Sequence, residues 1–224
     1  MRLPGRIVGE EAPVDPIPTV AASGPLLLAD LSGYTALLQG VSIAHADEFV
    51  GGVIPPAYGM VSEMVNGIVK SLVPPFTLAK LEGDAVFVYS TDDAATPQGP
   101  QLLEFVADSY SDFRSSLGTA LQTWVCTCSA CDVHQLELKF VLHLGTFAIQ
   151  EIAGRPELAG TDVVIAHRLL KNGAAAAAGT GAYLLVSESA ASGLGLPTDS
   201  AVRVVEAYEH LGALTTYVFA LDRP

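Results

Sequence analysis

The sequence has little cysteine, little positive charge and no long apolar run, and each shortage excludes a class of protein. Its three cysteines all lie between Cys126 and Cys131, so they are too few and too close together for a disulfide framework. Lys and Arg total 11 against 24 Asp and Glu, giving a net charge of −13 without a basic cluster. We therefore expect no nucleic-acid partner, because binding a phosphate backbone requires several such cations.

Half of the residues are hydrophobic, yet membrane insertion is not expected. The apolar stretches are interrupted by Gly, Pro, Asp or Lys, and they fall far short of the roughly 20 residues of a spanning helix. The first 18 residues start basic but contain no apolar segment followed by a cleavage site. These features predict a cytoplasmic protein with no membrane partner.

The length of 224 residues suits one domain with a decorated edge. Residues 1–24 contain four prolines and no periodicity, which predicts an extended N-terminal arm. Residues 25–224 are expected to form the domain, with a cysteine-rich insert at 123–135 after a long amphipathic helix over 101–124. Apolar runs and turn signals predict an α+β fold with strands at 25–31, 76–90 (a hairpin), 136–149, 183–187, 202–208 and 215–221, and further helices at 36–72 (two) and 162–171.

Two carboxylates occupy positions where a predicted strand meets a turn. Asp30 ends the first apolar strand, and Asp84 follows the Glu82-Gly83 turn of the hairpin. A pair of aspartates at the rim of a sheet could bind a divalent cation such as Mg²⁺. Asp30 could equally cap the following helix, with Asp84 a simple turn residue, and the spacing does not decide between these interpretations.

Five short segments follow one another along the chain in the order of known family motifs. They are Asp30-Leu-Ser-Gly-Tyr-Thr35, Lys80-Leu-Glu-Gly-Asp84, His143-Leu-Gly145, Glu157-Leu-Ala-Gly-Thr-Asp-Val-Val-Ile-Ala-His-Arg168 and Gly212-Ala-Leu-Thr-Thr-Tyr217. They resemble, in turn, the Asp-Ile-x-Gly-Phe-Thr, Lys-x-x-Gly-Asp, His-x-Gly, Asp-x-x-Gly-x-x-Val-Asn-x-Ala-x-Arg and Gly-x-x-x-Tyr motifs of class III adenylate/guanylate cyclases. The chain is thus similar to a divergent, uncharacterised branch of that family.

The resemblance implies a ferredoxin-like antiparallel sheet with covering helices, and a homodimer with active sites between the chains. It implies that Asp30 and Asp84 bind two Mg²⁺ or Mn²⁺ ions, while Lys80 and Glu157 of the other copy bind a purine base. Arg168 would bind the phosphates as the catalytic residue. The implied reaction is attack of the ribose 3′-oxygen on the α-phosphate, which releases pyrophosphate.

Three departures from the family pattern bear on catalysis. Val164 replaces a ribose-binding Asn, Leu211 replaces a phosphate-binding Lys, and Glu157 replaces an Asp that selects the base. Two hypotheses therefore stay open: a cyclase-like homodimer that turns over slowly, or an inactive pseudo-cyclase that acts as a regulatory or binding module. Val164 and Leu211 favour the second, and the Asp30/Asp84 pair favours the first.

The cysteine segment carries a second possible chemistry. Cys126, Cys128, Cys131 and His134 provide the ligand types of a tetrahedral, structural Zn²⁺ site within nine residues. Small buried apolar cysteines and a redox-active pair are the alternatives. Of the remaining histidines, His45 is expected to be solvated and His143 to be a hydrogen-bonded core residue.

Overall fold

A computed structural model describes residues 19–91, 94–122, 124, 126, 128 and 131–222. Strand β1 (Thr19–Ser32) begins inside the predicted arm, because residues 19–24 pair with β4 along its register from Thr19 opposite Gln150 to Gly24 opposite Gly145. Residues 1–18 of the arm and several residues of the predicted insert lie outside the described part. Among the described residues, no helix combines the length and apolarity needed to span a bilayer.

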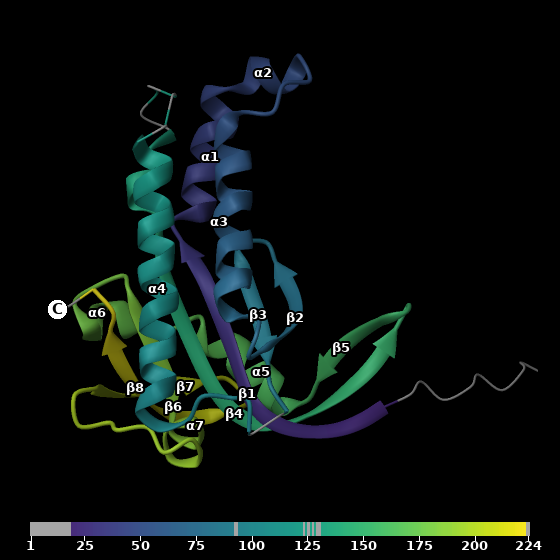
Figure 1. The fold of residues 1–224 in the computed structure, drawn as a ribbon, viewed down its shortest axis with the longest axis vertical. Coiled ribbons are helices and arrows are strands. Elements are labelled where there is room, and N and C mark those ends of the chain that lie inside the picture. The colour runs from purple at the N-terminus through teal and green to yellow at the C-terminus, as the bar shows by residue number, and fades with distance from the viewer. Residues whose placement is uncertain are drawn as a thin grey trace, which may run out of the picture.

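One mixed sheet organises the fold (Figure 1). Its strand order is β2-β3-β1-β4-β6-β8-β7, with β5 paired to β4, and the β4–β6 pair is parallel while the other pairs are antiparallel. The remaining strands are β2 (Thr77–Glu82), β3 (Ala85–Tyr89), β4 (Glu137–Ile152), β5 (Arg155–Ala159), β6 (Tyr183–Ser187), β7 (Val202–Tyr208) and β8 (Gly212–Ala220).

Side chains alternate in direction along the strands, and this alternation divides the core into two layers, one on each face of the sheet. In β1, Leu27 and Leu31 pack with the helices α3 (Pro56–Leu72) and α4 (Gly99–Gln122), whereas Leu26 and Leu28 pack on the opposite face with α5 (Thr161–Leu169). Successive strand residues point to opposite faces, so residues of one parity share a face. The parity of a strand residue therefore determines which polar side chains it can meet on its face of the sheet.

The helices follow from local sequence signals. α3 begins with Pro56 at its first position and buries Met60, Met64 and Ile68 at helical spacing. α1 (Tyr34–Ala44), α3 and α4 stand together and extend beyond the sheet at one end of the molecule (Figure 1). The shorter helices are α2 (Ala46–Val50), α6 (Ala174–Ala178) and α7 (Glu188–Gly193).

Candidate functional site

Strand register places the first predicted metal ligand in a row of charged side chains. Asp30 lies opposite Ala85 of β3 on one side and Lys139 of β4 on the other, and Ala85 lies opposite Glu82 of β2. These residues share the face that α5 covers. Lys139 Nζ is 2.9 Å from Asp30 Oδ2, and both side chains are about one-fifth exposed, at 20% and 19%. The carboxylate thus already has a cationic partner.

Asp84 lies close to Asp30 at the same rim. Burial raises the pKa of Asp84, and the negative charge of Asp30 raises it further, while Lys139 acts in the opposite direction. Burial and the charge of Asp84 also raise the pKa of Tyr34, which opens α1. Two carboxylates and one ammonium therefore share the site, and the unbalanced negative charge suits a cation.

Two of the remaining predicted site residues meet at a cavity on the α5 side of the sheet. Lys80 and Arg168 line this cavity of about 440 Å³, together with Lys171. Lys80 Nζ contacts Glu82 Oε1 at 2.7 Å and lies 4.0 Å from Glu157 Oε2. Lys80 and Arg168 therefore share one cavity on the same sheet face as Asp30, whereas Glu157 of β5 approaches Lys80 without lining the cavity.

His167 adds a group that the motif matching did not select. Its Nδ1 donates to the Val163 carbonyl at 2.8 Å, and its ring meets Phe87 edge-on. Nε2 is buried and lies 2.9 Å from Glu82 Oε2 without hydrogen-bond geometry. The side chain of His167 lines the cavity, while its Nε2 is turned toward the Glu82 carboxylate.

One of the motif departures lies in the cavity itself, and another lies in the β7–β8 turn. Val164 lines it and is 49% exposed, so an apolar side chain stands where the family places an amide. Leu211 follows His210 in the β7–β8 turn, where the backbone of His210 has a φ of 67°. Neither residue can donate a hydrogen bond from its side chain to a sugar or phosphate.

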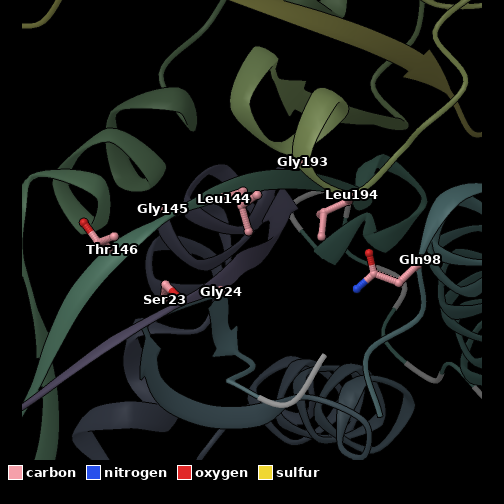
Figure 2. A pocket seen from close by; sticks show the side chains of 8 residues that line it. All are labelled: Ser23, Gly24, Gln98, Leu144, Gly145, Thr146, Gly193 and Leu194. Carbon is pink, nitrogen blue, oxygen red and sulfur yellow. The ribbon is translucent and has the colours of Figure 1, made fainter. Parts of the chain in front are cut away.

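A second cavity, of about 580 Å³, lies between β1, β4 and α7 (Figure 2). Its lining is mostly Gly and Leu, and the polar side chains among the labelled residues are Ser23, Gln98 and Thr146. None of these residues is charged, so this cavity cannot neutralise a polyanion. The smaller cavity on the α5 side is therefore the better candidate for binding a polyanionic ligand.

His143 is a hydrogen-bonded core histidine, as its place in an apolar strand predicts. Its Nδ1 lies 2.8 Å from Ser187 Oγ and its Nε2 lies 3.1 Å from Asp162 Oδ1. Burial acts to raise the pKa of Asp162, but the Thr146 backbone N–H and His143 outweigh it, so the pKa is lowered overall. This network fastens α5 and α7 to β4.

The structure brings the three cysteines together but supplies a different histidine. His45, Cys126, Cys128 and Cys131 have ligand atoms that all lie within 4.8 Å of one another, so the cluster could hold a metal ion. His134 is not in this group, because it lies exposed on a 3₁₀ turn whose cap is Asp132. His45 was expected to be solvated, yet its side chain is only 14% exposed.

Solved cyclase structures share this fold. The guanylyl cyclase Cya2 matches with a TM-score of 0.63 at 12% identity, covering 92% of this chain and 95% of that one. The adenylyl cyclase CyaB from P. aeruginosa matches with 0.61 at 13%, covering 90% and 96%. The catalytic core of a rhodopsin-guanylyl cyclase in complex with ATPalphaS matches with 0.52 at 15%, covering 91% and 99%. These likenesses confirm the predicted class III cyclase-like α+β fold.

Sequence relatives are less informative about activity. The uncharacterized protein Rv2561/Rv2562 of Mycobacterium tuberculosis (strain ATCC 25618 / H37Rv) is 36% identical over 100 residues, which are 42% of this chain. The match spans 44% of that relative, less than half of its length. Residues 61–178, just over half of the chain, match a family of unknown function. The chain belongs to that family, described as "Protein of unknown function (DUF2652)".

Proposed function

We propose that two copies of this chain bind a purine nucleoside triphosphate together with Mg²⁺ or Mn²⁺ and convert it slowly to a cyclic nucleotide and pyrophosphate. The observation that carries the proposal is the gathering of Lys80, Arg168 and Lys171 around one cavity, on the sheet face that also presents Asp30. In the reaction the ribose 3′-hydroxyl loses its proton, its oxygen bonds to the α-phosphorus, and the bond to the pyrophosphate group breaks.

Electrostatics favour a polyphosphate at this cavity. Three of the 11 Lys and Arg residues of a chain with a net charge of −13 line it. Arg168 lies in the last turn of α5 and Lys171 follows the helix C-cap Leu170, and both line the cavity, so they can face the same ligand. Their local positive potential is what lets an otherwise acidic protein hold a triphosphate.

Lys80 and Glu157 suit the edge of a purine base. The ammonium of Lys80 can donate to ring and carbonyl acceptors, and the carboxylate of Glu157 can accept from an amino or imino group. Their 4.0 Å separation supports a joint role in recognising one flat ligand. Glu82 holds Lys80 at 2.7 Å and so orients it.

Asp30 and Asp84 fit a divalent cation by the chemistry of their oxygens and by the repulsion that raises the pKa of Asp84. A cation bound there would favour the ionised 3′-oxygen and offset charge on the transferred phosphate. Lys139 already supplies one positive charge to Asp30. The structure therefore favours one divalent ion in this position more than two.

Homodimerisation is part of the proposal. The outer halves of β1 and β4 project with β5 away from the body of the molecule (Figure 1), and they expose Val20 at 63% and Ile152 at 49%. A projecting ribbon with apolar side chains gains stability from packing against a partner. Among the structural neighbours, one is described as a non-canonical dimeric guanylyl cyclase domain.

A second candidate function is an inactive pseudo-cyclase that binds a nucleotide as a regulatory or binding module. The Lys139–Asp30 ion pair favours it, since an ammonium group competes with a metal for the carboxylate. Val164 in the cavity and Leu211 near the C-terminus add to this candidate because both lack the polar atoms of the family pattern. The two candidates differ in turnover and not in ligand.

One experiment tests both candidates. The purified chain is incubated with Mn²⁺ and either ATP or GTP, and nucleotide binding, cyclic product and mass by light scattering are measured. Arg168→Ala should reduce product formation by about 10²–10³-fold, as for loss of a group that stabilises the transition state. Arg203→Ala, on β7, is the matched control and should change nothing.

The outcomes separate the candidates. Cyclic product from a dimer supports the cyclase, and tight binding without product supports the pseudo-cyclase. Absence of binding to either nucleotide with Mn²⁺ contradicts both, and a monomer in the presence of nucleotide contradicts the shared site.

A further inference from the structure

A cluster of three thiols and one imidazole lies apart from the proposed nucleotide site. It joins the junction of α1 and α2, where His45 lies, to the segment between α4 and β4, which contains the cysteines. His45 Nε2 is 3.5 Å from Cys126 Sγ, 3.3 Å from Cys128 Sγ and 3.2 Å from Cys131 Sγ. Cys126 Sγ and Cys128 Sγ are 3.4 Å apart.

These separations match four ligands around one tetrahedral ion. With Zn–S bonds of about 2.3 Å and Zn–N bonds of about 2.0 Å, tetrahedral angles give S···S distances of about 3.8 Å and S···N distances of about 3.5 Å. The four separations given above are shorter by at most a few tenths of an ångström, and Cys131 Sγ lies within 4.8 Å of the other two sulfurs, so small side-chain movements accommodate the ion. One nitrogen and three sulfurs are also a ligand set that Zn²⁺ prefers.

The other nitrogen of His45 provides an independent observation. Nδ1 lies 2.7 Å from Glu48 Oε1, one turn further along the chain. A histidine that binds zinc through one nitrogen commonly donates the other N–H to a carboxylate, which fixes the tautomer and the ring orientation. Glu48 therefore presents the Nε2 lone pair to the sulfurs.

We propose that His45, Cys126, Cys128 and Cys131 bind one structural Zn²⁺, with Glu48 as the positioning residue of His45. All four ligand positions are filled by protein, which is the arrangement of structural and not catalytic zinc. The ion would link the α1–α2 junction to the segment between α4 and β4. It would thereby fix the end of α1, the helix that starts two residues after the end of β1, against the segment that leads into β4.

Buried apolar cysteines do not explain the cluster. Cys131 is buried, but Cys126 and Cys128 are partly exposed and all three sulfurs converge on a polar ring. A disulfide between two of them would leave the third thiol and the oriented imidazole without a role. Metal binding accounts for all four side chains and for Glu48.

The test measures the metal directly. The full chain, purified under reducing conditions without added metal, should contain close to one zinc per chain by elemental analysis. His45→Gln and Cys128→Ser should each lose most of the zinc and lower the melting temperature, whereas His134→Gln, the matched control, should retain both. Glu48→Gln should keep the fold and weaken zinc affinity by about 10–100-fold in a competition with a chelating dye.

Cobalt substitution gives a readout that does not depend on stability. Co²⁺ added to chelator-treated protein should produce the intense visible absorption of tetrahedral cobalt–thiolate, and it should be lost in Cys128→Ser. Protein without zinc that fails to take up either ion, with three freely titrating thiols, would overturn the proposal. Zinc loss in His134→Gln equal to that in His45→Gln would overturn the ligand assignment.

Discussion

Replacing Lys139 with Met removes the cation that Asp30 holds and leaves a side chain of similar length. The ion pair has a 2.9 Å contact between groups that are both about four-fifths buried, with exposures of 20% and 19%. Exposed ion pairs contribute about 0–1 kcal/mol, but removing one partner of a largely buried charged hydrogen bond costs about 1–3 kcal/mol. We therefore expect Lys139→Met to lower the free energy of unfolding by about 1–3 kcal/mol in metal-free protein.

The same change should strengthen metal binding. A divalent ion on the Asp30 carboxylate would lie on the order of 4 Å from the Lys139 ammonium, and their repulsion even at the dielectric constant of water is about 2 kcal/mol. Removing the ammonium should thus tighten Mn²⁺ binding by about 30-fold or more. Mn²⁺ should then restore part of the stability that the variant has lost, because a ligand that binds the folded state stabilises it.

Calorimetric titration with Mn²⁺ and urea unfolding with and without the ion measure both effects. Lys70→Met, an exposed lysine of α3, is the matched control and should leave both quantities unchanged. An unchanged or weaker Mn²⁺ affinity in Lys139→Met would refute the idea that the ammonium and a metal compete for the same carboxylate.

Two further substitutions probe the site and its support. Asp84→Asn should stabilise metal-free protein at neutral pH, because the raised pKa of Asp84 means that its ionisation opposes folding. This gain should vanish as the pH falls below the ordinary value of 3.8, and urea unfolding at several pH values measures it. Gly145→Ala would place a Cβ 2.2 Å from Asp162 Cγ and should cost about 1–3 kcal/mol by thermal unfolding. Gly59→Ala meets no atom within 4 Å and should not destabilise, while an equal loss in both glycine variants would contradict this steric explanation.

Elements with a strong local pattern could be predicted from the sequence, whereas β5 could not. The apolar run of β1 and the helical stripes of α3 and α4 depend on residues close in the chain. Gly154 and Pro156 are residue types typical of a turn or loop, and so the sequence predicts no strand there. They belong to a tight turn and an edge strand: Gly154 has a φ of 74°, and Pro156 is tolerated because β5 pairs only with β4 among the described strands.

Resemblance to the cyclase motifs selected five candidate site residues but did not predict the charge balance around them. Lys139 meets Asp30 through cross-strand register, which joins residues more than 100 positions apart in the chain. The available signal was a lone lysine between Leu138 and Phe140 in an apolar strand, since a charge there requires a partner. The sequence could thus have indicated that Lys139 is paired, although it could not identify Asp30 as the partner.

The histidine at the cysteine cluster could not be identified from the sequence either. His134 follows Cys131 closely, but the turn that buries Val133 and uses Asp132 as its cap leaves His134 exposed. His45 is 81 residues from Cys126 and reaches it only because α3 and α4 pack side by side and bring the ends of α1 and α4 together. Three thiols leave a tetrahedral ion one ligand short, so the sequence requires a fourth group without identifying it. Side-chain direction, which depends on the fold, selects the distant histidine over the near one.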